Sequence, residues 1–389
     1  MAKGAPFTYQ FGAIRGRQAG REYYAAMVPL DLVPKLFLFD EKELEPHLRA
    51  QRKLNIARIP EIARYVLENP RGYVFSALTA SVDGPMEFLP VKQNGVEVCV
   101  GEVKVPITAR FIINDGQHRR AAIEEVLRKR PELGSETICV VLFGDVGLKR
   151  SQQMFADLNK HAVRPTRSLG ILYDHRDPLS QLARELVDSV PVFRDLTEMD
   201  KATISNRSVK LFTLSSIYFA TRQLLRKGAR AAISREEERL AKAFWTHVSN
   251  NMPDWQRAAE KSVASSELRR QYIHAHGVAL QAIAMAGAEL IVHAPKRWPE
   301  RLAALRTVNW ERGNRQLWEG RATIGGRVSK ATNNVVLTAN VIKEQFGLKL
   351  GVSEVTLEQI HGDAKRRPRT RGSTFSRPAH YRRPSAPSA

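Results

Sequence analysis

The residues best suited to chemistry lie between Asp115 and Arg120, where an acid, a glycine, an amide, an imidazole and two guanidinium groups follow one another. Residues 111–113 before them form a short apolar run, which is typical of a buried strand. Asp115-Gly116 is a turn dipeptide, because glycine adopts positive φ without steric cost. Residues 118–130 then have helical spacing up to Pro131. A strand, a tight turn and a helix N-terminus bring backbone N–H groups and basic side chains together, which predicts an anion site.

The side chains of this turn could each contribute to binding a phosphate. Arg119 or Arg120 would pair with the phosphate bidentately, and Gln117 would donate a hydrogen bond to it. His118 would add charge below its pKa or serve as an acid or base. The alternative is structural: Asp115 caps the helix and Arg120 faces solvent. Both interpretations stay open, and the phosphate-binding candidates here are Asp115, Gly116, Gln117, His118, Arg119 and Arg120.

Two further basic groups could line the same anion site. Asn159 and Lys160 are followed by Arg164 in a proline-containing turn, although a helix C-cap with cations at the helix end explains them equally well. Arg52 lies in the basic run at residues 51–53, which is otherwise the solvated end of a helix. We retain all four residues as candidates for binding phosphate or nucleic acid.

Residues 174–177 are the string Asp174, His175, Arg176 and Asp177, in which two carboxylates flank a histidine and an arginine. Such a string could bind a metal or perform acid–base chemistry, and His175 and Arg176 could also contact phosphate. More often it is a solvated turn before a helix, here with Asp177 as the N-cap and Pro178 in the first helical position.

The sequence lacks the motifs that are typical of several large enzyme classes. We find no phosphate-binding loop with lysine, no dinucleotide fingerprint, no zinc-protease helix and no nucleophile elbow. Cys99 and Cys139 lie in apolar runs, so we expect neither a disulfide nor a metal site. No cofactor is expected unless the turn binds a nucleotide. The protein is therefore more readily a binding protein than an enzyme, and the catalytic candidates are Asp115, His118, Asp174 and Asp177.

A formal net charge of +21 over 389 residues indicates a polyanionic partner, of which nucleic acid is the commonest. Residues 362–389 contribute +7 of this charge, so the rest of the chain is strongly basic as well. No apolar run is long enough for a membrane helix, and residues 1–20 lack the apolar segment of a signal peptide. We expect a cytoplasmic protein with no membrane partner.

The pattern of the first half predicts an α+β fold. Residues 1–25 are predicted to be a flexible arm, and residues 26–165 a mixed sheet with helices. Residues 27–39 should be strand or loop, 41–51 a short helix, and 59–67 an amphipathic helix. Alternating or β-branched runs separated by turn residues predict strands at 73–82, 86–91, 96–100, 103–107 and 137–143.

The second half is predicted to be mainly α-helical from residue 166 to residue 361. Helical spacing covers residues 151–159, 168–172, 179–190, 208–226, 235–249, 266–293, 333–346 and 353–361. Residues 310–330 mix basic and aromatic side chains with glycines and should form an ordered loop. The last two helices could form a helix-turn-helix, although their spacing is loose. Residues 362–389 are rich in Arg, Pro and Ser and should be a disordered basic tail.

The sequence Asp115-Gly116-Gln117-His118-Arg119 resembles the signature of the DGQHR-domain family, whose members are distantly similar to the ParB and sulfiredoxin fold. The chain also resembles the DndB family, found beside bacterial DNA phosphorothioation genes, at residues 51–55, 73–78, 154–160 and 172–177. The resemblance implies a ParB-like first domain. It also implies a DNA-binding transcriptional repressor that acts on double-stranded DNA at the operator of a sulfur-modification operon.

Two other functions compete with this one. The first is a nucleotide hydrolase or nuclease built on the ParB-like turn, and the second is a non-catalytic adaptor that binds other sulfur-modification proteins. Converging carboxylates at Asp115, Asp174 and Asp177 would favour the enzyme, whereas carboxylates dispersed as helix caps would favour the repressor. The operator, the effector and the oligomeric state, for which a homo-oligomer is one option, do not follow from the sequence.

Overall fold

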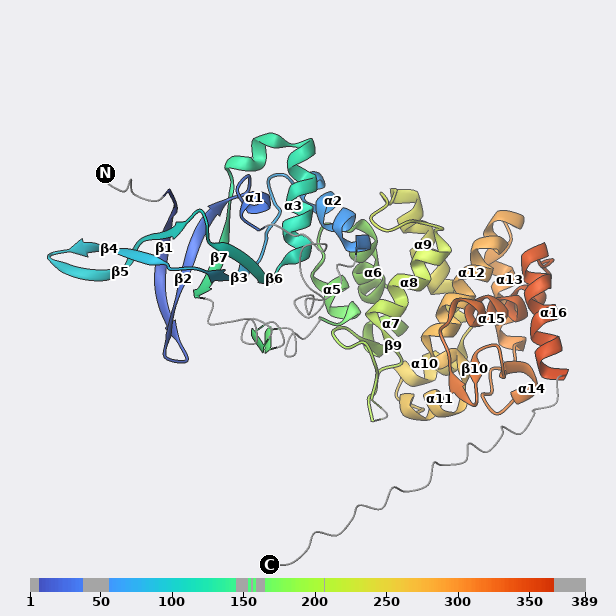
Figure 1. Cartoon of the computed structure of the whole chain (residues 1–389). Helices are drawn as coiled ribbons and strands as arrows, with labels where there is room; N and C mark the ends of the chain where they lie inside the picture. Colours follow the sequence, from blue (N-terminus) through green and yellow to red (C-terminus); the bar gives the residue numbers. More distant parts are fainter. Residues whose placement is uncertain are drawn as a thin grey trace, which may run out of the picture. The chain divides into compact units, whose positions relative to one another are not determined.

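The computed structural model describes residues 7–37, 56–144, 153–154, 157–158, 165–205 and 207–366. The chain divides into two compact units, Met1–Val163 and Arg164–Ala389. The first unit is built on a mixed β-sheet and the second is mainly helical, which confirms the α+β order of the two halves (Figure 1). The helix predicted at residues 41–51 lies outside the described residues, and so do residues 367–389 of the tail predicted to be disordered from residue 362. The start of that predicted tail is wrong, because residues 362–366 continue the last helix of the chain.

Seven strands form the sheet of the first unit in the order β4-β5-β1-β2-β7-β3-β6. Only the pairing of β3 with β7 is parallel, and the other neighbours are antiparallel. The strands are β1 (Thr8–Gln18), β2 (Arg21–Pro29), β3 (Leu78–Asp83), β4 (Glu87–Gln93), β5 (Val96–Pro106), β6 (Arg110–Asp115) and β7 (Thr137–Gly144).

The predicted flexible arm is wrong, because residues 8–29 form a β-hairpin inside the sheet. Phe11 and Ala13 of β1 are buried while their neighbours Gln10 and Gly12 are exposed, which is the period-two alternation of a half-buried strand. β1 and β2 are joined by Ala19-Gly20, and both residues have positive φ, as a tight two-residue hairpin turn requires. The hairpin lies between β5 and β7, so it is an interior part of the sheet.

The strands predicted on either side of Gly101 are one continuous strand, β5. A Cβ atom at Gly101 would lie 2.1 Å from the carbonyl oxygen of Leu89 on β4. The register of β4 against β5 shifts between Pro90 and Lys92, next to this contact. The glycine therefore allows a close approach of two backbones at a bulge and does not end the strand.

Helices pack against this sheet and against one another. α3 (Gln117–Lys129) contacts α1 (Val33–Leu36) and α2 (Ile59–Glu68). Two short 3₁₀ helices, η1 (Ile56–Arg58) and η2 (Pro131–Ser135), flank α2 and α3 in the chain. Ile123 of α3 joins the apolar side chains of the sheet in one core, and Val126 joins a second core with α2. The amphipathic helix predicted at 59–67 is confirmed by α2.

The second unit is organised around α12 (Gly277–His293), which is apolar around most of its circumference and buried for most of its length. It packs against α8 (Leu214–Leu224) and α15 (Thr332–Gln345). The other helices are α5 (Arg167–Tyr173), α6 (Pro178–Ser189), α7 (Pro191–Leu196), α9 (Arg235–Asn250), α10 (Pro253–Ala259), α11 (Ser265–Gln271), η3 (Ile273–Ala275), α13 (Trp298–Arg301), η4 (Leu302–Thr307), α14 (Arg315–Trp318) and α16 (Val352–Arg366). Two short strand pairs complete it, β8 (Thr197–Glu198) with β9 (Phe212–Thr213) and β10 (Thr323–Ile324) with β11 (Arg327–Val328).

Two helices differ from their predicted bounds: one is shorter in the structure and the other is interrupted. The helix expected at 208–226 begins only at Leu214, where the hydroxyl of Thr213 accepts a hydrogen bond from the backbone of Ser216. The helix expected at 266–293 is interrupted between α11 and α12, because Ile273 donates its backbone N–H to Trp310 at 2.8 Å. Arg312 likewise donates its backbone N–H to the carbonyl oxygen of Gln271 at 2.7 Å. Tertiary backbone pairing therefore replaces helical hydrogen bonds here.

The segment at residues 310–330, expected to be an ordered loop, contains α14 and the β10–β11 pair. The helices expected at 333–346 and 353–361 are confirmed by α15 and α16. No helix among the described residues combines the length and apolarity needed to cross a membrane.

Candidate nucleic-acid interface

The predicted strand, turn and helix around Gly116 are present. β6 ends at Asp115 and α3 begins at Gln117, with Gly116 between them at φ 109°. A Cβ atom at Gly116 would lie 2.3 Å from Cδ2 of Leu78, so both the backbone conformation and the available space require glycine. The N-cap predicted at Asp115 is wrong: Gly116 is the N-cap residue, and no side chain caps the helix.

The two arginines of the turn have partners within the fold. Arg119 pairs with Asp115 at 2.7 Å and donates a hydrogen bond to the carbonyl oxygen of Ser76 at 3.2 Å. The side chain of Arg119 is 17% exposed and that of Arg120 is 12% exposed. Arg119 therefore holds the turn against the chain that leads into β3.

Arg120 uses its whole guanidinium group inside the first unit. Its Nε donates to the carbonyl oxygen of Phe37 at 2.8 Å, and one terminal nitrogen donates to that of Pro34 at 2.9 Å. The other terminal nitrogen pairs with Glu124 at 2.5 Å. These bonds satisfy carbonyl groups at the C-terminal end of α1, which is a common use of arginine at helix ends.

Gln117 and His118 begin α3. Gln117 is buried, and its amide donates to the carbonyl oxygen of Ile113 at 3.2 Å, which ties the start of the helix to β6. His118 is half-buried in the first helical turn. The phosphate site at this turn stays a prediction, because the arginines that would bind an anion also hold the fold together.

A double-mutant cycle on Arg119 and Asp115 tests this turn. We expect Arg119→Ala and Asp115→Ala each to lower the free energy of unfolding by about 1–2 kcal/mol, since each removes a charge-assisted hydrogen bond that is partly exposed. The double variant should lose less than the sum, with a coupling energy of about 1 kcal/mol. Arg128→Ala on the exposed side of α3 is the matched control. Unchanged unfolding of Arg119→Ala together with lost DNA binding would instead support a phosphate contact.

The string at residues 174–177 forms a turn and a helix cap. Asp177 is 4% exposed and caps α6, accepting hydrogen bonds from the backbone N–H and the hydroxyl of Ser180. Burial raises the pKa of Tyr218 to about 12, and its hydrogen bond to Asp177 adds to the shift. Asp174 accepts from the backbone N–H groups of Arg176 and Asp177 at 3.0 and 3.1 Å. The helix cap predicted at Asp177, with Pro178 in the first helical position, is confirmed.

The other two residues of the string, His175 and Arg176, are exposed. Nδ1 of His175 lies 3.5 Å from the guanidinium group of Arg184, which also donates to three backbone carbonyl groups of this segment. The described part of the chain contains no group of three or more His, Cys, Asp or Glu side chains placed to hold a metal ion. Arg52, Asn159, Lys160 and Arg164 lie outside the described residues, so their predicted contacts with an anion stay predictions.

The positive charge is distributed unequally between the two units. Residues 1–163 carry a formal net charge of +4 and residues 164–389 carry +17, which together make +21. Of the +17, residues 362–389 carry +7. The helical unit is therefore basic in its own right, and it also contains arginines that the sequence did not single out, among them Arg270 at the end of α11.

Comparison with known proteins relates the chain to a protein family. A family model described as DndB, DNA-sulfur modification-associated, matches residues 11–349, which include strands of the sheet and most of the helical unit. No curated protein and no solved structure matches the chain.

Proposed function

The chain belongs to the DndB family of DNA-sulfur modification-associated proteins, and from this premise we propose that it is a DNA-binding transcriptional repressor of a DNA phosphorothioation operon. The family match supports the link to DNA modification. The observation that favours direct DNA binding is the net charge of +17 on residues 164–389. A protein that neutralises phosphates needs such an excess of lysine and arginine, because phosphate contacts supply most non-specific affinity for DNA.

In this proposal the helical unit and the basic residues after His361 supply the phosphate contacts. The first unit contributes a rigid sheet domain, for which we keep the ParB-like fold as part of the proposal. The arginines of its turn, Arg119 and Arg120, are held by Asp115, Glu124 and backbone carbonyl groups. Asp174 and Asp177 accept backbone hydrogen bonds, and this favours the repressor over the nuclease or nucleotide hydrolase.

A gel-shift experiment tests the proposal. We expect duplex DNA from upstream of the protein's own operon to bind at least tenfold more tightly than a shuffled duplex of the same length and composition, because specific sites typically exceed non-specific ones by ~10³-fold or more. A chain truncated after His361 should bind both duplexes more weakly by the same factor, because contacts between arginines and phosphates do not distinguish bases. Equal affinity of the full chain for both duplexes would contradict a repressor.

A further inference from the structure

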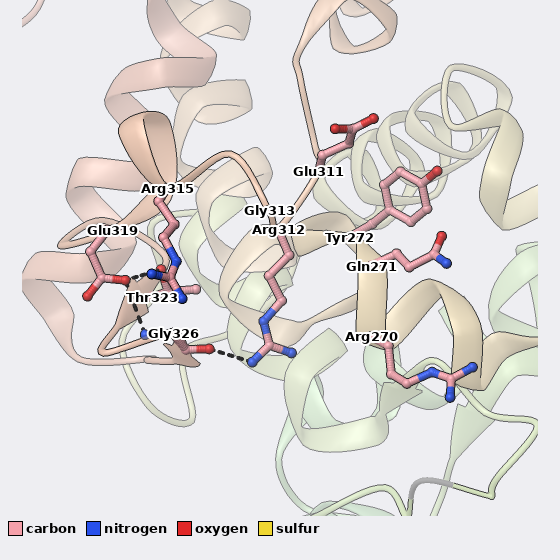
Figure 2. Close-up of a pocket in the computed structure, with 10 residues that line it drawn as sticks. All are labelled: Arg270, Gln271, Tyr272, Glu311, Arg312, Gly313, Arg315, Glu319, Thr323 and Gly326. Carbon is pink, nitrogen blue, oxygen red and sulfur yellow. Dashed lines mark hydrogen bonds between the residues drawn. The ribbon is translucent and has the colours of Figure 1, made fainter.

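The helical unit contains a polar pocket of about 460 Å³, within the ~300–1,000 Å³ range of small-molecule sites. Figure 2 shows three arginines around it, Arg270 from one segment and Arg312 and Arg315 from another, with the ring of Tyr272 to one side. The residues that matter for its chemistry are Arg270, Tyr272, Glu311, Arg312, Arg315 and Glu319. All of them lie in the second unit, between α11 and β11.

Backbone hydrogen bonds fix the frame of this pocket. The segment before α14 pairs with the segment after α11 through an antiparallel bridge between Tyr272 and Glu311. The bonds from Ile273 to Trp310 and from Arg312 to Gln271 lie on either side of that bridge. The backbone positions of Arg270 and Arg312 are thereby set relative to one another without any ligand.

The three arginines differ in the hydrogen bonds and ion pairs that their side chains form within the protein. Among the described residues, Arg270 is exposed and its side chain forms no hydrogen bond or ion pair. Arg312 donates one terminal N–H to the carbonyl oxygen of Gly326 at 2.6 Å, and Figure 2 shows this bond orienting its guanidinium group along the pocket. A guanidinium group has five N–H donors, so Arg312 retains donors for a ligand.

The two carboxylates that line the pocket, Glu311 and Glu319, offset only part of the positive charge of the three arginines. Glu319 accepts hydrogen bonds from the backbone of Gly325 and Gly326 and from the hydroxyl of Thr323, and Gly325 and Gly326 both have positive φ. These bonds keep the pKa of Glu319 below its usual value even though burial opposes the shift. Glu319 faces Arg315 as well, so two arginines, Arg270 and Arg312, have no carboxylate of their own among the described residues.

Tyr272 adds an aromatic surface beside the cations. One face of its ring stacks on His274, with ring centroids 5.1 Å apart and planes 17° apart. His274 is buried and is itself held between Trp255 and Asp254, at 3.1 and 3.0 Å. The tyrosine ring is therefore held in place before anything binds, and stacking of a base on such a ring contributes ~1–3 kcal/mol.

We propose that this pocket binds a free nucleoside phosphate, with the phosphate on Arg270 and Arg312 and the base against Tyr272. Bidentate guanidinium pairing suits phosphate oxygens, and an aromatic ring suits any base. The volume of about 460 Å³ leaves room for more than a single phosphate group. This proposal goes beyond the repressor function and does not depend on it.

Calorimetric titration of the full chain without DNA tests the proposal. The probes are the 5′-monophosphates of adenosine, guanosine, cytidine and uridine, each titrated separately, with adenosine and inorganic phosphate for comparison. We expect at least one monophosphate to bind more tightly than both of its parts. Arg270→Ala should raise its Kd roughly ten- to a hundred-fold, because a charged hydrogen bond is lost. Arg235→Ala on α9, an exposed arginine that does not line the pocket, should leave the Kd unchanged.

Variants of Tyr272 measure the contribution of the base to the affinity separately from that of the phosphate. Tyr272→Phe should retain the affinity, whereas Tyr272→Ala should raise the Kd roughly five- to a hundred-fold. Arg270→Ala should melt like the parent, since Arg270 has no partner in the described fold. The proposal is overturned if no monophosphate binds or if Arg270→Ala binds as the parent does. It is also overturned if Arg270→Ala weakens only duplex DNA binding, which would assign the pocket to a backbone phosphate.

Discussion

Duplex DNA should bind this protein about 10³–10⁵-fold more weakly at 200 mM salt than at 50 mM salt if about 6–10 phosphates are neutralised. The reason is release of the counterions that condense on DNA, which becomes less favourable as the salt concentration rises. The net charge of +21 makes contacts of this number reasonable. Fluorescence anisotropy with a labelled duplex, read at several salt concentrations, gives the slope of log affinity against log salt.

The truncation after His361 is the control for this slope. It removes a net charge of +7, so the slope should become shallower by several units while remaining clearly negative, because residues 164–361 retain +10. A flat profile for the full chain would rule out binding through phosphate contacts. A truncated chain with no slope at all would place every phosphate contact after His361 and would contradict the basic interface on the helical unit.

Local patterns predict many elements of this fold. The strands β3, β6 and β7 have apolar or β-branched runs, and α2 has a clear apolar face, so each can be found from the sequence. The prediction of a flexible arm misses the hairpin of β1 and β2, although Phe11 and Ala13 alternate with exposed neighbours. A strand end at Gly101 is a wrong prediction because a single sequence does not show that Leu89 lies against this glycine.

The candidate site is harder to predict, because it depends on contacts between distant segments. The turn at Gly116 follows from its residues, but the partners of Arg120 are carbonyl groups more than eighty positions earlier in the chain. The pocket exists because residues 310–312 pair with residues 271–273 and interrupt a helix that periodicity alone would continue. The mixture of arginines and tryptophans at 310–330 indicates a basic segment without indicating that Arg270 and Tyr272 face it.

Lys343→Met should be the most destabilising of the substitutions considered in this chain, lowering the free energy of unfolding by about 3–5 kcal/mol. Lys343 lies on α15 with its side chain 0% exposed, and its ammonium group pairs with Glu289 of α12 at 2.5 Å and with Glu354 of α16. It thus joins three helices. Removing the lysine leaves two carboxylates, 29% and 14% exposed, close together with no cation between them.

Thermal melting and urea unfolding measure this loss, which corresponds to a fall of roughly 6–20 °C in Tm for a unit of this size. Lys349→Met, at an exposed position just beyond α15, is the matched control and should change stability by less than about 0.5 kcal/mol.

The triple variant Lys343→Met, Glu289→Gln and Glu354→Gln should recover most of the stability that Lys343→Met loses, because it removes the unpaired charges. The amide oxygen that Glu354→Gln introduces can still accept the hydrogen bond that the backbone of Gly351 donates to Glu354 in the parent. A Lys343→Met protein as stable as the Lys349→Met control would show that these ion pairs do not hold α12, α15 and α16 together.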